Sequence, residues 1–473
     1  MTSPTTTQPT SGHTRRLAIN RLRERVVSDR ASIDRFLTRH PAPLIEGRYA
    51  TFVWRGKADE VMVRHRVVGL PDPLHLRRIP GTDLWYVTIE LPEGSRVEYQ
   101  FDIVRDGGRE EHVSDPLNPR VAHGPFGSSS VCAATGYAVP GWTLPDPETR
   151  PGELQPMSLR SKALRREQPF QLYLPARFVG VSRYPLLVVH DGDDYLRYAA
   201  ARTVLDNLIH RGEVAPLVAA FLPPGDRLVE YANNAPHARF VARELVPFLS
   251  GRLPLIDRPD GRCLMGSSFG GVASLSTAVR YPDLFGSLLL ESGSFVFTDI
   301  GDDHGGGPVF DPVVKFVNAY RGRPRKVANR VYQTCGVYEP LITPNRSMVS
   351  TFWDAGMDVR YVEARDGHNW ENWRDRLRDA LTWIYPASRS SSTNDRRREA
   401  AGMKVTERWT SPDWAGRSPW PAGGTSARRC WSTPPPGGTP GRSSGTSSSP
   451  TSVSSSTAAG SRSTPSTAWP GRP

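Results

Sequence analysis

The chain has 473 residues, of which 38% are hydrophobic, so it is long enough for two or three domains and apolar enough to bury a core. Its net charge of +12 comes from scattered basic residues, and because no basic run is interleaved with aromatic residues, the composition argues against a nucleic-acid-binding protein. No run approaches the roughly 18 apolar residues of a membrane span, and residues 1–16 lack the apolar segment of a secretory signal, so we expect neither membrane insertion nor secretion.

The N-terminal third contains two kinds of pattern. Residues 1–40 are a polar tail followed, at 15–39, by apolar side chains at helical spacing, which predicts one or two amphipathic helices. Residues 41–145 then change to short alternating runs separated by Gly, Pro and Asp. This pattern predicts an all-β, immunoglobulin-like sandwich domain. Its strands are expected at 49–56, 60–68, 84–92, 96–106 and 129–136.

A Pro-rich connector at 139–156 leads into the second predicted domain, residues 146–386. Apolar strands alternate there with helical segments, and several strands are almost entirely apolar, as burial on both faces of a mostly parallel sheet requires. The fold class is therefore α/β. Strands are expected at 168–178, 184–192, 216–224, 261–268, 286–294, 329–337 and 358–367. Helices are expected at 199–212, 240–253, 270–282, 347–356 and 373–386.

Residues 387–473 consist largely of Ser, Thr, Pro, Gly and Arg, and this low-complexity composition predicts a disordered tail. The four cysteines form no CxxC pair and have no close histidine, so neither a zinc site nor a disulfide framework is expected. Such cysteine usage is typical of a reducing compartment, and we expect a cytoplasmic protein without a metal. The cysteines are Cys132, Cys263, Cys335 and Cys430.

Residues 262–275 read RCLMGSSFGGVASL, which predicts a strand, a tight turn and a helix. Gly266, Ser268 and Gly270 match the GxSxG pattern, in which a nucleophile occupies a strained strand-to-helix turn. Side chains two positions before and after the nucleophile would collide in such a turn, and the glycines avoid this collision. A glycine-rich loop without a catalytic role is the alternative. The partners of Ser268 therefore decide between the two interpretations.

Folds with this turn place the acid and then the histidine after the serine along the chain. His368 is the best histidine, since it follows a predicted strand and precedes the last helix. His190 lies upstream of the serine, and His304 lies in a glycine-rich loop, so both are weaker candidates. A solvent-facing loop histidine without a catalytic role is the alternative for His368.

Glu339 is the favoured acid, because it lies on the loop after the preceding strand. Asp354 and Asp358 stay open as alternatives. Glu363 and Asp366 are too near His368 in sequence to accept its Nδ1 proton easily.

The developing negative charge at the reacting carbonyl needs two backbone N–H donors, each worth roughly 3 kcal/mol. One is the amide of Phe269, which follows the nucleophile. The second is expected in the loop after the strand at 184–192, at the amide of Asp193 or Asp194. Cation binding by these acidic residues is the alternative, but no matching ligand set is visible elsewhere.

The chain from about 40 to 386 resembles the enterochelin (enterobactin) esterases, which belong to the esterase D branch of the α/β-hydrolases. The likeness is carried by LLVVHDGDDY, DRLVEY, MGSSFGGVASL, CGVYEPLITPNRSM and ARDGHNWENW in the second domain, and by RRIPGTDLWYVTIELP and SDPLNPR in the β domain. It implies Ser268 as nucleophile, His368 as base and Glu339 or a nearby carboxylate as acid. It also implies an α/β-hydrolase fold preceded by a β-sandwich.

The resemblance further implies a substrate, the cyclic triserine trilactone of a catecholate siderophore, which often carries ferric iron. Arg227 and Glu230 match an RxxE pair that shapes the site in relatives, although a structural salt bridge is an equal reading. Arg227 is expected to meet an anionic ligand. Tyr195 and Trp370 are expected to stack on catechol rings.

We therefore expect a serine carboxylic ester hydrolase that acts through an acyl-enzyme and needs no cofactor. Its partner is a small ester molecule. An acyl-sugar or feruloyl-type esterase of the same family is one alternative, and a hydrolase-like binding protein with an incomplete triad is another. Acyl group, alcohol group, iron dependence and oligomeric state are not specified by the sequence.

Overall fold

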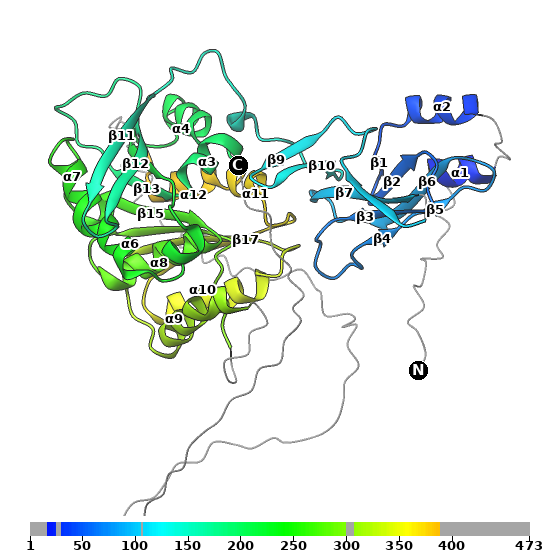
Figure 1. The fold of residues 1–473 in the computed structure, drawn as a ribbon. Coiled ribbons are helices and arrows are strands. Elements are labelled where there is room, and N and C mark those ends of the chain that lie inside the picture. The colour runs from blue at the N-terminus through cyan, green and yellow to red at the C-terminus, as the bar shows by residue number, and fades with distance from the viewer. Residues whose placement is uncertain (1–16, 25–29, 106, 299–306, 388–473) are drawn as a thin grey trace, which may run out of the picture. The chain divides into compact units, whose positions relative to one another are not determined.

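The computed structural model of the chain describes residues 17–24, 30–105, 107–298 and 307–387 (Figure 1). The predicted disordered tail beyond Ala387, the polar segment before residue 17, His304 and Cys430 lie outside these ranges. No helix among the described residues is both long and apolar enough to cross a membrane.

The N-terminal domain consists of two antiparallel sheets. Their strand orders are β1-β2-β6-β5 and β4-β3-β7-β10-β9, with β8 also paired to β7. Phe52, Tyr99 and Phe101 are fully buried in the core of this domain. The strands are β1 (Leu44–Glu46), β2 (Tyr49–Arg55), β3 (Glu60–Arg64), β4 (Leu74–His75), β5 (Arg77–Arg78), β6 (Leu84–Glu90), β7 (Arg96–Arg105), β8 (Arg109–Val113), β9 (Val121–Gly124) and β10 (Gly127–Ala133).

Two helices precede these strands, α1 (Ala18–Glu24) and α2 (Arg30–Arg39). Their apolar side chains, including Ile19 and Phe36, form one cluster with Val53 of β2 and Leu84 of β6. The helices therefore cover apolar side chains of the first sheet that would otherwise meet water.

The second domain is built on an eight-stranded sheet in the order β11-β12-β14-β13-β15-β16-β17-β18. Strands β11, β12 and β14 pair antiparallel, and every pair from β14 through β13 to β18 is parallel. The strands are β11 (Glu153–Ser161), β12 (Arg166–Leu174), β13 (Leu186–His190), β14 (Val218–Leu222), β15 (Arg262–Ser267), β16 (Ser287–Glu291), β17 (Arg330–Gly336) and β18 (Asp358–Ala364). We keep 41–145 and 146–386 as the proposed extents of the two domains.

Helices cover both faces of this sheet (Figure 1). Alternate residues of β13 point to opposite faces, so Leu186 and Val188 join one core while Leu187 and Val189 join the other. The first core includes side chains of α7 (Val246–Ser250), α8 (Phe269–Arg280), α9 (Asp311–Gly322) and α10 (Ile342–Asp354). The second includes side chains of α3 (Gly192–Tyr198), α4 (Ala201–His210), α11 (Trp370–Arg374) and α12 (Leu377–Ile384). Two short helices, α5 (Arg227–Glu230) and α6 (Ala235–Arg239), follow β14.

The parallel strands bring their carboxyl ends to one edge of the sheet, where open α/β folds place their sites. Ser268 follows β15, Glu339 follows β17 and His368 follows β18. Strands β15 to β18 are consecutive in the sheet. The three predicted catalytic residues therefore lie along the same edge.

Candidate active site

The serine turn has the geometry that its glycines predict. Ser268 lies between β15 and α8 with φ 55° and ψ −122°, a region that residues with a side chain rarely adopt. A Cβ atom on Gly266 would lie 2.3 Å from the Gly270 carbonyl oxygen, and one on Gly271 would lie 3.1 Å from Gly293 Cα. Glycine is thus required where the turn closes on itself and where α8 approaches the next strand.

We expect Gly266→Ala to destabilise the fold by about 1–3 kcal/mol, because the new methyl group would force the backbone of the turn apart. Esterase activity should fall with it, since the displaced backbone carries Ser268. Urea unfolding and hydrolysis of a nitrophenyl ester measure the two effects. Gly180→Ala is the matched control, because a Cβ atom there meets nothing within 4 Å. Equal stability of both variants would contradict the close approach.

Ser268 is partly exposed, and its hydroxyl lies 3.1 Å from the Ser294 hydroxyl. Its own amide donates to the Glu291 carbonyl at 3.0 Å, which ties the turn to the end of β16. The amide of Phe269 is the first of α8 and has no acceptor within the helix. It is therefore available, beside Ser268, to a developing oxyanion.

The predicted acid, Glu339, and the predicted base, His368, are in direct contact. His368 Nδ1 lies 2.5 Å from Glu339 Oε2, and the other carboxylate oxygen accepts hydrogen bonds from the Ser292 hydroxyl at 2.6 Å and the Gly336 amide at 2.7 Å. Burial alone would raise the pKa of Glu339, but His368 and these two donors hold the pKa below its usual range. Glu339 therefore stays ionised and orients the imidazole.

The ring of His368 is held from a second side by Trp373, at a centroid distance of 5.0 Å and an interplanar angle of 89°. Trp373 Nε1 donates to Ser292 Oγ at 2.9 Å. Ser292 thus links Trp373, which packs against the His368 ring, to Glu339. Sequence reasoning missed both Ser292 and Trp373, although Ser292 lies near the end of a predicted strand and Trp373 lies within a segment quoted for its family likeness.

No hydrogen bond joins Ser268 and His368, both of which the structure describes; the serine hydroxyl contacts Ser294 instead. The structure therefore brings Glu339 and His368 together and places Ser268 on the same sheet edge. Apo enzymes often form the contact between such a serine and histidine only when substrate is bound.

The competing acids have other roles. Glu363 is paired with Arg346, through oxygens 2.6 and 2.7 Å from its guanidinium. Asp366 is buried and accepts a hydrogen bond from the amide of Gly367 at 2.7 Å. Asp354 ends α10, and Asp358 begins β18, so neither reaches the edge at which β18 ends.

The other described histidine candidate, His190, is fully buried at the end of β13, and its Nε2 lies 3.1 Å from Nε2 of His237. Burial lowers the pKa of His190 to about 4 and the pKa of His237 well below its usual value. The pair is therefore neutral at physiological pH. His190 Nδ1 also lies 3.0 Å from the Ser274 hydroxyl of α8, so both histidines belong to the buried interior.

Asp193 and Asp194 lie in the first turn of α3, directly after β13, which neighbours β15 in the sheet. Their amides have no acceptor within the helix, so either can serve as the second oxyanion donor predicted. Burial raises the pKa of the Asp194 carboxyl to about 6, with the charge of Asp191 adding to the effect. Among the described residues, no group of three or more His, Cys, Asp or Glu side chains is arranged to hold a metal ion.

Comparisons with known proteins agree with this architecture. Residues 161–384 match the family profile described as "Putative esterase", and residues 49–142 match that of the enterochelin esterase N-terminal domain. The iron(III) enterobactin esterase of Escherichia coli O6:H1 is 28% identical over 369 residues, which cover 70% of this chain and 90% of that protein. The chain belongs to the enterochelin esterase family.

Solved structures of this family share the fold. The enterochelin esterase of Shigella flexneri superposes with a TM-score of 0.60 at 22% identity, over 76% of this chain and 98% of that one. The enterobactin esterase of Shigella flexneri, solved in the presence of enterobactin, gives 0.59 at 23% identity, over 71% and 92%. The predicted α/β-hydrolase fold with an N-terminal β domain is thereby confirmed.

Arg227 and Glu230, which match the RxxE pair of the enterochelin esterase family, bind different partners. Arg227 donates two hydrogen bonds of 2.8 Å to Asp191, whereas Glu230 pairs with Arg166. The alternative of a structural salt bridge between Arg227 and Glu230 is therefore wrong, because each residue is paired with a different partner. The guanidinium carbon of Arg227 lies 5.9 Å from the ring centre of Phe269, the residue after Ser268, and about a third of the Arg227 side chain is exposed.

The two aromatic residues expected to stack on a ligand are buried. Tyr195 has no exposed surface, and its hydroxyl donates to Glu291 at 2.5 Å. Trp370 is 8% exposed and packs edge-to-face against Tyr195 and Trp373. The expectation that Tyr195 stacks on a catechol ring is therefore wrong, and Trp370 contributes packing to the second core of this enterochelin esterase family member.

Glu291, which sequence reasoning missed, is fully buried below the serine turn. Burial raises the pKa of its carboxyl to about 8, although the hydrogen bond from Tyr195 opposes the shift. Its second oxygen has no hydrogen-bond partner among the described residues. The side chain is therefore neutral at physiological pH and leaves no negative charge below the Ser268 turn.

Glu291→Gln should change how stability depends on pH. Below about pH 4.5 the Glu291 carboxyl is protonated in both the folded and the unfolded protein, so it does not lower the free energy of unfolding. Between about pH 4.5 and 8 the unfolded chain ionises while the folded chain does not, and stability falls. We expect the glutamine variant to be about 2–4 kcal/mol more stable than the wild type at pH 8, with little difference at pH 4.5. Urea titrations at both pH values measure this, with exposed Glu148→Gln as control; a pH-independent difference would contradict it.

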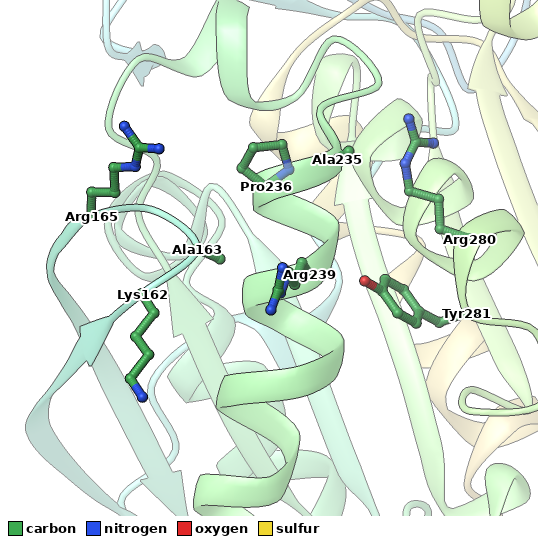
Figure 2. A pocket seen from close by; sticks show the side chains of 8 residues that line it. All are labelled: Lys162, Ala163, Arg165, Ala235, Pro236, Arg239, Arg280 and Tyr281. Carbon is green, nitrogen blue, oxygen red and sulfur yellow. The ribbon is translucent and has the colours of Figure 1, made fainter.

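Two hollows of the described surface lie away from this site. One, of about 810 Å³, is lined by residues at the opposite edge of the sheet, including Tyr184 and Pro216. The other, of about 460 Å³, carries four cationic side chains (Figure 2). Lys162 and Arg165 lie there on one side of α6 and Arg280 on the other, so their charges do not converge on a point (Figure 2). Neither hollow includes Ser268, Glu339 or His368.

Proposed function

We propose that this chain is a serine esterase that hydrolyses the trilactone of a catecholate siderophore through an acyl-enzyme on Ser268. The observation that carries the chemistry is the Glu339–His368 contact of 2.5 Å on the sheet edge that also presents Ser268 on a strained turn. A carboxylate, an imidazole and a serine in this order perform acyl transfer on many folds. Membership of the enterochelin esterase family supports an ester bond as the target.

The reaction starts with proton transfer. His368 Nε2 takes the proton of the Ser268 hydroxyl as its oxygen attacks the ester carbonyl, while Glu339 holds the opposite ring nitrogen. The imidazolium then gives the proton to the leaving alcohol, which leaves the acyl group on Ser268. Water repeats the sequence from the other side, and hydrolysis restores the free serine. No cofactor takes part in these steps.

The substrate assignment draws on the relatives and on charge. Iron(III) enterobactin esterases align over most of their length with this chain, and one structural neighbour was solved in the presence of enterobactin. The exposed part of Arg227 lies next to Phe269, the residue after the nucleophile. A guanidinium at that position suits a catecholate, whose oxygens are anionic and which carries ferric iron as cargo.

We also propose that the enzyme works in the cytoplasm on a small molecule, without nucleic acid or membrane as a partner. The three cysteines among the described residues, Cys132, Cys263 and Cys335, are buried and unpaired. Burial raises the pKa of each thiol, so they remain protonated and unreactive. Free thiols of this kind support a reducing compartment.

The test is incubation of enterobactin, iron-free and ferric, with the wild type and with Ser268→Ala, followed by chromatography with mass detection. We expect linear trimer and smaller catechoyl-serine fragments with the wild type alone. If both proteins leave the trilactone intact while the wild type cleaves a nitrophenyl ester, the esterase assignment stands and the siderophore is the wrong substrate. Acyl-sugar and feruloyl esters are then the next substrates to assay.

A further inference from the structure

The N-terminal β domain contacts the loop that carries the proposed base. Strand β7 begins at Arg96, whose amide donates to the Arg365 carbonyl at 2.9 Å. Arg365 lies three residues before His368. The side chain of Arg365 reaches back in the opposite direction, and its guanidinium donates to the Glu93 carbonyl at 2.5 Å. The chain around the start of β7 is therefore bonded to this loop by one backbone hydrogen bond and by one from the Arg365 side chain.

The guanidinium of Arg96 binds the same loop on both sides of His368. It is 3% exposed, and its Nη1 donates to Asn369 Oδ1 at 3.0 Å and to Asp366 Oδ1 at 3.3 Å. Asp366 and Asn369 are also bonded to each other at 2.7 Å. His368 lies between these two residues in the chain. A single side chain of the β domain thus fixes residues both before and after the histidine.

Charge makes this contact specific. Three carboxyl groups, those of Glu98, Asp366 and Glu371, lie within 2.9 to 3.3 Å of the Arg96 guanidinium. Burial would lower the pKa of Arg96, but these carboxyl groups outweigh it and keep the side chain charged. Burial raises the pKa of Asp366 to about 6 against the effect of Arg96. Removing the cation would therefore leave buried acids without their partner.

The loop of the proposed acid is held by the same part of the β domain. Ser95 donates its hydroxyl proton to the Pro92 carbonyl at 2.6 Å, so the Tyr338 hydroxyl, 2.6 Å away, donates to Ser95. The Tyr338 carbonyl accepts from the Val68 amide at 3.0 Å, and its amide donates to the Asp366 carbonyl at 3.1 Å. Tyr338 immediately precedes Glu339. Both loops are therefore tied to adjacent residues, Ser95 and Arg96, and to each other.

We propose that Arg96 is a positioning residue for catalysis, which holds the His368 loop through Asp366 and Asn369 so that the imidazole meets Glu339. The inference rests on the proposed triad. It gives the β domain a part in the chemical step. A displacement of about 1 Å at a catalytic group can cost on the order of a hundredfold in rate.

The experiment compares Arg96→Met with Arg64→Met on nitrophenyl acetate. Arg64 is the matched control, because it bonds to Asp102 within the β domain and Asp102 keeps His112 as a second partner. We expect Arg96→Met to lower kcat 10- to 100-fold with KM changed less than twofold, and Arg64→Met to retain both values. Wild-type kcat in a folded Arg96→Met protein would overturn the inference.

Two further variants separate positioning from loss of stability. Arg96→Lys keeps the charge and should recover part of kcat. Arg96→Met combined with Asp366→Asn removes a buried charge together with its partner, so its melting temperature should rise above that of Arg96→Met while kcat stays low. Recovery of kcat together with the melting temperature would overturn the positioning role.

Ser268→Ala, assayed beside these variants, distinguishes the two levels of the proposal. An inactive Ser268→Ala with a fully active Arg96→Met leaves the triad standing and removes only the role of Arg96. An active Ser268→Ala removes the triad and, with it, the positioning role.

Discussion

Ser268→Ala should lower kcat on any ester substrate by about 10⁵- to 10⁶-fold, the loss seen when the nucleophile of a serine triad is removed. The expectation follows from the turn, which presents only this hydroxyl to solvent. The adjacent Ser267 belongs to β15 and is fully buried. Steady-state kinetics on a nitrophenyl ester give the size of the effect, and circular dichroism checks that the variant is folded.

Ser267→Ala is the matched control, since it removes the same atom one residue away. We expect it to retain wild-type kcat. If the two variants lose activity equally, the loss reflects disturbance of the turn, and the assignment of Ser268 as nucleophile fails. A residual rate near 10³-fold above water in Ser268→Ala is compatible with the proposal, because the oxyanion donors and substrate binding remain.

Glu339→Gln should lower kcat by about 10³- to 10⁴-fold with little loss of stability. The Ser292 hydroxyl and Gly336 amide both donate to one oxygen of Glu339, so they would fix the glutamine carbonyl in that position. The amide nitrogen would then face His368 Nδ1 as a donor. The imidazole would have to accept there and carry its proton on Nε2, which is the wrong tautomer to take a proton from serine.

Glu363→Gln is the control for this prediction, because Glu363 lies on β18 near the same histidine and is paired with Arg346. It should retain activity. Measurement of kcat for both variants with a nitrophenyl ester, alongside their melting temperatures, decides the matter. If only Glu363→Gln loses activity, Glu339 is not the acid. Glu363 then takes that role, although its closeness to His368 in sequence disfavours it.

Sequence patterns predicted the sheet and its edge well, because both depend on local signals. Buried parallel strands are nearly all apolar, and their carboxyl ends must share an edge, so the order of Ser268, Glu339 and His368 along the chain was enough to place them there. Strand β11 and helix α9 were not predicted. Strand β11 is a partly exposed edge strand that begins in the Pro-rich connector, and its residues mix polar and apolar types without strict alternation.

The errors at the candidate site concern partners and burial. The partner of Arg227 is Asp191, 36 residues away, and that contact depends on how the loops after β13 and β14 meet. Tyr195 lies only two residues from the exposed Asp193, so the rotation of α3 about its axis decides that the tyrosine ring points into the core. Spacing alone carries no information on either point, and the catalytic roles themselves stay predictions until the variants are assayed.

The contacts of Arg96 and Ser95 with the catalytic loops have a consequence for how the enzyme matures. Arg96 and Asp366 are 270 residues apart in the chain, and Ser95 and Tyr338 are 243 apart. Contacts between such distant residues form late, because the entropy of closing the loop between them is lost before they stabilise anything. On the ribosome, strand β7 can pair with its neighbours inside the β domain, but Ser95 and Arg96 must wait for β17 and β18 to emerge before they find these loops. In refolding, esterase activity should therefore return after the helical signal and the burial of the two cores.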